Sequence, residues 1–149
     1  KSDCVVDISV DAFIPDKYIS NTSNRIEAYK KIASLETRDD VSDLLDELID
    51  RYGDVPESVM GLIEISLMRV QAASLGITEI VQRKDTVIFY GSKFSQINMT
   101  EFLKKTKFRI VINSAGKQYI SAQIPVGGNS IDTMKSVLET LLECKDKDE

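Results

Sequence analysis

The chain has 149 residues, of which 42% are hydrophobic and 29% charged, and it carries a formal net charge of −5 at pH 7. These values are typical of one globular domain with a buried core, and no apolar run reaches the ~18–20 residues that a membrane-spanning helix needs. Histidine is absent, which excludes the commonest general base, the Ser–His and Cys–His nucleophile pairs and most zinc sites.

The acidic charge is concentrated in the first half of the chain. Residues 1–76 hold 15 acids and 8 bases, whereas residues 77–149 hold 9 acids and 11 bases. The first half would therefore repel nucleic acid and attract a basic protein partner. The chain begins without Met or a signal-peptide pattern, so it reads as part of a longer, cytoplasmic protein in which Cys4 and Cys144 are free thiols.

The first twenty residues predict an extended lead-in. Hydrophobic residues alternate along 8–12 and the alternation breaks at Pro15, which favours a short edge strand or an extended arm. We expect this arm to dock on the rest of the domain through four bulky side chains, Phe13, Ile14, Tyr18 and Ile19.

Three helices are predicted next. Candidate N-cap residues and a helical period predict the first over residues 21–36. In the stretch DVSDLLDELIDRYGDVPESV (40–59) a second helix ends at Gly53, and Pro56 begins a third that ends at Gly76, so these two helices form a hairpin. The apolar residues of the second helix recur at helical spacing and form a core-facing stripe of Val41, Leu44, Leu45, Leu48, Ile49 and Tyr52.

The second half reads as strands with two helices. Residues 76–91 and 108–124 each predict a strand, a turn and a strand, while short and amphipathic helices are expected over 97–107 and 129–145. The fold class is therefore α+β, with a three-helix first half packed on a small, mainly antiparallel sheet with two further helices. The expected boundaries are an arm over 1–20, one domain over 21–144 and a frayed tail over 145–149.

Sequence motifs for catalysis or cofactor binding are not found. The chain has neither a GxxxxGK[ST] loop nor a GxGxxG pattern. The glycines of VGGNSID (126–132) precede a helix N-terminus, where an anion could bind, but a flexible loop is the simpler interpretation. The carboxylates of DELID (46–50) fit an exposed helix face better than a catalytic pair. We expect no catalytic residue, cofactor or metal ion in this chain.

One basic cluster is a candidate for nucleic-acid binding. The segment KKTKFRI (104–110), beside Phe102, combines cations with aromatic rings that could stack on bases. However, Phe102 and Phe108 also fit core positions, and four surface charges usually form a solvated rim. We expect no direct nucleic-acid binding by this chain, and no membrane partner.

Three blocks of the first half, in this order and spacing, resemble one family: DAFIPDKYI (11–19), RIEAYKKIAS (25–34) and ELIDRYGDVPESV (47–59), followed by AASLGI (72–77). They are similar to the C-terminal module of the bacterial transcription-repair coupling factor (Mfd). Beyond residue 90 the similarity rests on the order of elements alone. Two departures are that Lys31 replaces the usual Arg and Tyr52 replaces Phe.

The resemblance implies a role within a larger protein. That protein is an ATP-driven translocase on double-stranded DNA, which displaces stalled RNA polymerase and recruits nucleotide excision repair. Its ATP-binding motor lies upstream of this module. In the family the C-terminal module is a regulatory clamp that packs on the N-terminal module resembling the excinuclease B subunit and hides the surface that binds excinuclease A. By this resemblance, the expected function is a non-catalytic, autoinhibitory interaction domain.

The expected partner contact lies on the second helix. Asp43, Asp46, Glu47 and Asp50 follow helical spacing, at which like charges repel by ~0.2–0.5 kcal/mol per pair. The family's partner surface is rich in arginine, which carboxylates complement. The resemblance therefore points to Glu47 and Asp50 first, and to Asp43 and Asp46 second. The simpler interpretation is a solvated face on which Glu47 and Arg51 form an i,i+4 pair.

Other functions remain open. A contact module for RNA polymerase or another repair protein would use the sheet or the KKTKFRI rim. An auxiliary DNA-binding domain would use Lys104, Lys105 and Arg109, and its affinity would fall steeply with salt. An enzyme of unknown type would need a pocket that the sequence does not show.

Overall fold

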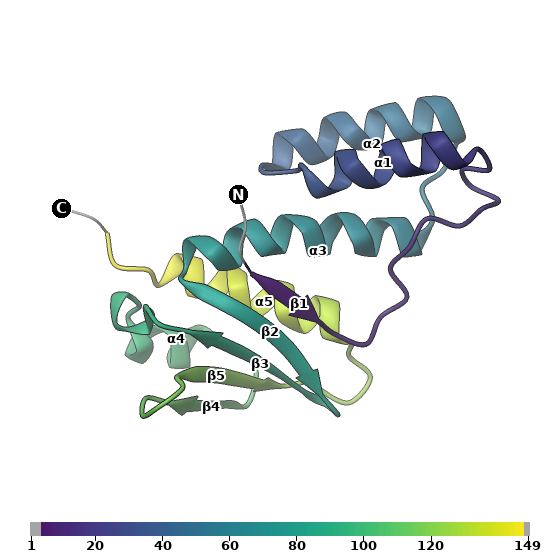
Figure 1. Ribbon diagram of the computed structural model, residues 1–149. Coiled ribbons are helices and arrows are strands. Elements are labelled where there is room, and N and C mark those ends of the chain that lie inside the picture. Colours follow the sequence, from purple (N-terminus) through teal and green to yellow (C-terminus); the bar gives the residue numbers. More distant parts are fainter. Residues whose placement is uncertain (1–3, 148–149) are drawn as a thin grey trace. The chain divides into compact units, whose positions relative to one another are not determined.

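The computed structural model describes residues 4–147. Its contacts group into two compact units, shown in the ribbon of Figure 1. The helical unit comprises residues 10–67, and the sheet unit comprises the chain before and after it, up to Ser9 and from Met68 onward. Each unit is built around its own set of buried side chains, so the two are taken in turn.

The helical unit contains α1 (Thr22–Ala33), α2 (Arg38–Tyr52) and the first turns of α3 (Glu57–Ser74). Local capping explains where the first two helices begin and end. The Asn21 side chain accepts a hydrogen bond from the Asn24 N–H, and Thr37 forms a capping box with Asp40. Gly53 ends α2 with φ of +88°, a backbone conformation that favours glycine.

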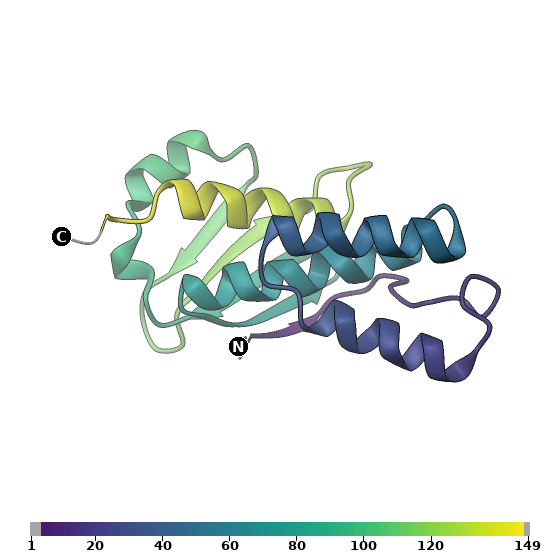
Figure 2. The same cartoon turned by 90° about the horizontal axis from the view of Figure 1, so that it is seen from above.

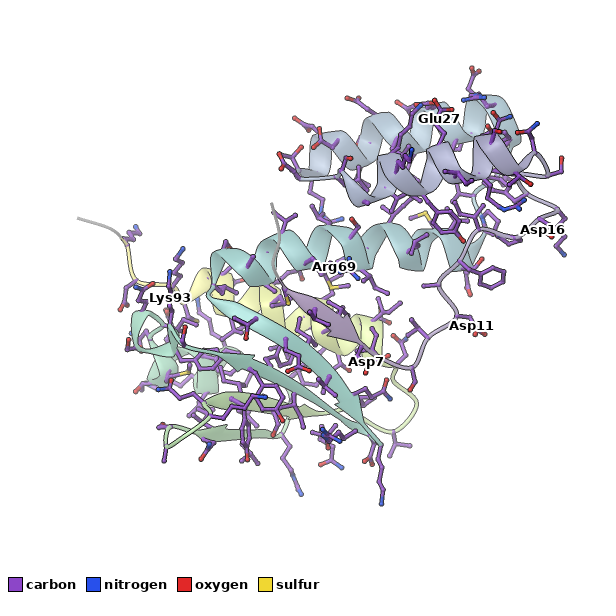
Figure 3. The ribbon with its side chains drawn as sticks, viewed as in Figure 1. Asp7, Asp11, Asp16, Glu27, Arg69 and Lys93 are labelled. Atoms are coloured by element: carbon purple, nitrogen blue, oxygen red, sulfur yellow. The ribbon has the colours of Figure 1, made fainter. Side chains whose placement is uncertain are left out.

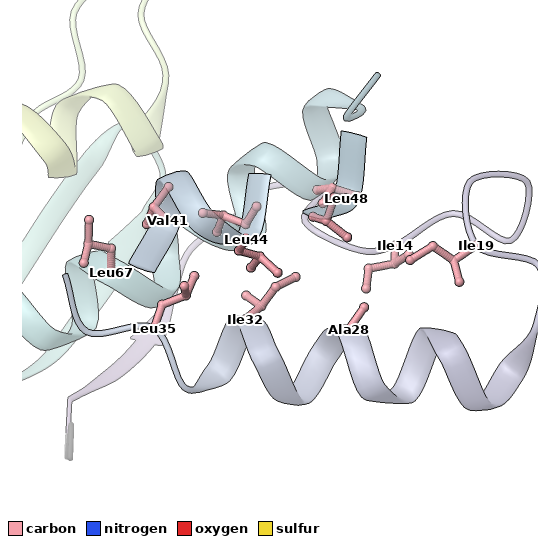
Figure 4. Close-up of a cluster of buried hydrophobic side chains, with 11 residues drawn as sticks. Ile14, Ile19, Ala28, Ile32, Leu35, Val41, Leu44, Leu48 and Leu67 are labelled. Carbon is pink, nitrogen blue, oxygen red and sulfur yellow. The ribbon is translucent and has the colours of Figure 1, made fainter. Parts of the chain in front are cut away.

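The core of the helical unit is aliphatic (Figure 4). Burial of each Val, Leu or Ile side chain in this core stabilises the fold by roughly 1.5–3 kcal/mol. The arm before α1 contributes two of these residues, while its Phe13 is 48% exposed. The members of the cluster are Ile14, Ile19, Ala28, Ile32, Leu35, Val41, Leu44, Leu48, Val59, Ile63 and Leu67.

The sheet unit holds a five-stranded sheet in the order β1-β2-β3-β5-β4. The short β1 (Val5–Asp7) runs parallel to β2, and all other neighbours are antiparallel. The β2–β3 hairpin turns at Lys84, whose φ is +56°. The remaining strands are β2 (Ile77–Arg83), β3 (Thr86–Gly91), β4 (Ile110–Asn113) and β5 (Tyr119–Gln123).

Helix α5 (Ser130–Glu143) lies along one face of the sheet (Figure 2). Its Met134 and Leu138 are fully buried, as are Phe89 of β3 and Phe102 of the short α4 (Met99–Lys105). A 3-10 turn (Phe94–Gln96) precedes α4. The segment after α5 is held to this turn: the Asn98 N–H donates to the Cys144 carbonyl and the Asp146 N–H to the Gln96 carbonyl.

The structure confirms the predicted α+β class and mainly antiparallel sheet, and corrects three local expectations. The strand of the lead-in lies at Val5–Asp7 rather than along 8–12, because its partner is the distant β2. Ile49, expected in the core stripe, is 50% exposed at the margin of the buried face, and Phe13, expected to dock the arm on the domain, is 48% exposed.

The predicted boundaries of the arm and of the single domain stay predictions, since groups of contacts do not show which segments fold independently. Within the predicted frayed tail, Lys145 pairs with Ile97 in an isolated bridge, and residues 148 and 149 lie outside the described part of the chain.

Candidate interaction site

The structure places the four predicted carboxylates on one side of α2. We call this set, Asp43, Asp46, Glu47 and Asp50, the acidic face. The residues that α2 turns to the core are Val41, Leu44 and Leu48, so the acidic face flanks the buried stripe. Asp43, Asp46 and Asp50 are exposed and form no ion pair with other described residues, so their charges are available to a partner.

Glu47 differs from the other three because it is already paired. Its Oε2 atom lies 2.5 Å from Lys31 Nζ of α1 and 3.5 Å from Arg51 Nη1, one turn along α2. The hydrogen bond from Lys31, followed by the charge of Lys31 and the contact with Arg51, lowers the pKa of the Glu47 carboxyl. The same hydrogen bond raises the pKa of the Lys31 ammonium.

An open groove of about 420 Å³ runs between α1 and α2, beside the acidic face. Glu27, labelled in Figure 3, lines it from α1, and like Asp43 opposite it makes no ion pair within residues 4–147. Asp40 is engaged, because its carboxylate accepts backbone N–H bonds from Glu36 and Thr37. The other lining residues are Lys30, Lys31, Ser34, Leu35, Leu44 and Glu47.

Sequence reasoning missed the partner of Glu47. Lys31 precedes it by 16 residues and comes from another helix, so no local spacing rule links them. The i,i+4 pair of Glu47 with Arg51 was visible in the sequence and is present. Tyr29, in the same block as Lys31, uses its hydroxyl to accept a hydrogen bond from the Ile14 N–H, which fastens the arm to α1.

The basic cluster belongs to the sheet unit and is partly neutralised. Lys105 Nζ lies 3.5 Å from Glu101 and 3.6 Å from Glu143 carboxylate oxygens, and the charge of Glu101 chiefly raises the Lys105 pKa. Phe102 is fully buried, as its core position predicts. Lys104 and Arg109 are exposed. The cluster therefore offers fewer free cations and one fewer aromatic ring than its sequence suggests.

Among residues 4–147, no group of three or more Cys, Asp or Glu side chains is arranged to hold a metal ion. Cys4 and Cys144 are buried, and neither forms a disulfide within residues 4–147. Over the same residues, none of the helices combines the length and the apolar character needed to cross a bilayer.

Comparison with known proteins identifies relatives of this chain. The family model of the TRCF domain matches residues 8–103. The transcription-repair-coupling factor of Staphylococcus aureus (strain USA300) is 42% identical over 83 residues, which are 56% of this chain and 7% of that protein. The corresponding factor of Staphylococcus haemolyticus (strain JCSC1435) is 35% identical over 104 residues, which are 68% of this chain and 9% of that protein. The chain thus spans less than a tenth of these relatives.

A solved structure extends the similarity beyond the segment that the family model matches. The crystal structure of the C-terminal domain of a transcription-repair coupling factor superposes with a TM-score of 0.84 at 25% sequence identity, covering 97% of this chain and 95% of that one. Because the family model covers well over half of the residues and the fold agrees along nearly the whole chain, this chain belongs to the TRCF domain family, the C-terminal domain of transcription-repair coupling factors.

Proposed function

We propose that this domain is an autoinhibitory clamp within a transcription-repair coupling factor. It would bind the N-terminal excinuclease B-like module of its own protein and cover the surface used by excinuclease A. The full-length protein would be an ATP-dependent DNA translocase that displaces stalled RNA polymerase in the bacterial cytoplasm. The observation that carries the clamp is the acidic face: Asp43, Asp46 and Asp50 are exposed on one side of α2 and unpaired among the described residues.

Carboxylates held this way suit a partner rich in arginine. Guanidinium groups pair with carboxylates in a fork geometry, and complementary charge favours the correct partner. Each exposed ion pair contributes only ~0.2–1 kcal/mol. A contact built from three or four of them is weak between separate molecules and becomes effective only when both partners belong to one chain, which raises their effective concentration. A reversible clamp needs this combination.

The test is titration calorimetry of the domain against the N-terminal excinuclease B-like module of its protein, at low and at physiological salt. We expect weak binding that salt reduces, and its loss in the double variant Glu47→Lys/Asp50→Lys. A matched control is Asp85→Lys/Glu139→Lys, which makes the same change in net charge at two exposed positions of the sheet unit. This control should keep most of the binding.

Two results would argue against the clamp. Absence of binding at millimolar concentration and low salt would exclude it, and RNA polymerase and DNA would become the partners to test. Equal loss in both double variants would show that net charge, rather than the acidic face, drives the association.

A further inference from the structure

The most favoured carboxylate of the acidic face is occupied from within the domain. Lys31 and Arg51 both direct a cationic nitrogen at Oε2 of Glu47. These are charges of the kind that an arginine-rich partner would bring to the same oxygen. A partner cation can pair fully with Glu47 only if it displaces or shares this internal contact.

We propose that Lys31 and Arg51 are internal competitors of the clamp partner and set how tightly the clamp closes. The proposal rests on the proposed function and goes beyond it, because it assigns the control of clamp strength to two cations of the domain itself. Lys31 is the stronger competitor, since its nitrogen is 2.5 Å from the Glu47 oxygen whereas that of Arg51 is 3.5 Å away.

The geometry allows this exchange without unfolding. The side chains of Lys31, Glu47 and Arg51 keep 39%, 37% and 41% of their surface exposed. Lys31 and Glu47 also line the open groove between α1 and α2, so an incoming side chain reaches them from solvent. A lysine has rotatable bonds enough to swing its ammonium away from Glu47 while its backbone stays in the helix.

The neighbouring Lys30 provides a matched control. It lines the same groove from the same helix and carries the same charge, but makes no ion pair with any described residue. Removing Lys30 or Lys31 changes the net charge equally. A general electrostatic effect would therefore change binding alike in both variants, whereas competition predicts an effect specific to Lys31.

The experiment is the titration described above, repeated with Lys31→Met and Lys30→Met in the 149-residue chain. We expect Lys31→Met to bind the N-terminal module about 5-fold more tightly than the wild type, the upper end for one exposed ion pair. Lys30→Met should tighten binding by less than about 2-fold at physiological salt, where separated surface charges are largely screened.

A second measurement tests the internal contact without the partner. Carbon-detected NMR titration of the free domain reports the pKa of the Glu47 carboxyl, which the Lys31 hydrogen bond lowers. Lys31→Met should move this pKa toward the usual value for glutamate, while Lys30→Met should leave it unchanged. Circular dichroism confirms that both variants are folded.

The outcomes separate the two proposals. Unchanged or weaker binding by Lys31→Met, or equal tightening by both variants, would overturn internal competition while the clamp itself stands. An unchanged Glu47 pKa in Lys31→Met would also overturn it, because the cation would not occupy the carboxylate in solution. If the wild type and all variants fail to bind, the clamp fails, and with it the competition that depends on it.

Discussion

The hydroxyl of Tyr18 closes the C-terminal end of α2, and its removal should weaken the helical unit. The oxygen lies 3.0 Å from the Gly53 carbonyl and 3.4 Å from the Leu48 carbonyl. Gly53 is the C-cap residue of α2, so its carbonyl lies beyond the last intrahelical hydrogen bond and needs another donor. Tyr18→Phe deletes the donor and keeps the ring, whose centroid is 5.8 Å from that of Tyr52.

The expected loss is one hydrogen bond. A hydroxyl has a single proton, so it donates to one carbonyl at a time, and the contact with Gly53 has the better distance. That contact is partly open to water, which can hydrate the carbonyl in the variant. We therefore expect the free energy of unfolding to fall by about 1 kcal/mol, near the middle of the range for one hydrogen bond. In a chain of this length the midpoint should drop by roughly 2–4 °C.

Urea and thermal unfolding followed by circular dichroism measure this loss. Tyr52→Phe is the control, because Tyr52 packs against the same ring and its hydroxyl makes no hydrogen bond with the described residues. Burial raises the pKa of Tyr18, so its contribution is present below the usual tyrosine pKa of about 10 and is lost as pH rises above it. Equal losses in the two variants, or a difference that does not shrink as the pH rises above 10, would refute the reasoning.

The other predictions concern the cap, the Cys4 thiol and the basic cluster. Gly53→Ala should destabilise the domain by about 1–3 kcal/mol in urea unfolding through backbone strain alone, since φ is +88° and no atom lies within 4 Å of an added Cβ; an unchanged midpoint would contradict this. Burial raises the Cys4 pKa to about 11, so the native thiol should react with Ellman's reagent at pH 8 at least about 100-fold more slowly than in urea, being about 0.1% thiolate. Because the Cys4 pKa is higher in the folded state, the thiol contributes to the stability of the fold below pH 9, and this contribution is lost as the pH rises toward 11. On DNA-cellulose at physiological salt the chain should not be retained, because Lys105 is paired with two carboxylates; retention abolished by Lys104→Ala/Arg109→Ala would instead favour the DNA-binding alternative.

Local patterns were sufficient to predict most elements of this fold, because their causes are local. The helical period predicts α2 and Gly53 predicts where it ends, and the turn at Lys84 follows from the two strand-like runs around it. Strand β1 is only three residues long and pairs with a strand about seventy residues later, so no nearby pattern marks its position.

The candidate site likewise combines features that local spacing predicts with a contact that depends on how the helices pack. The acidic face follows from spacing within one helix, and the pair of Glu47 with Arg51 follows from the i,i+4 rule. The contact of Glu47 with Lys31 depends on how α1 and α2 pack, which the spacing of residues in either helix does not determine. Ile49 shows the opposite kind of error. Its spacing places it in the apolar stripe of α2, but the side chain is half exposed because α1, α3 and the arm cover only part of that stripe.

The helical unit lies between β1 and β2 in the sequence, so β1 is synthesised well before the strand with which it pairs. Val5 pairs with Glu79, so β1 leaves the ribosome roughly 4–15 s before its partner at ~5–20 residues per second. All residues of the helical unit emerge within that interval, and helices form in microseconds. We therefore expect the helices of this segment to begin to form on the nascent chain before β1 can pair with β2.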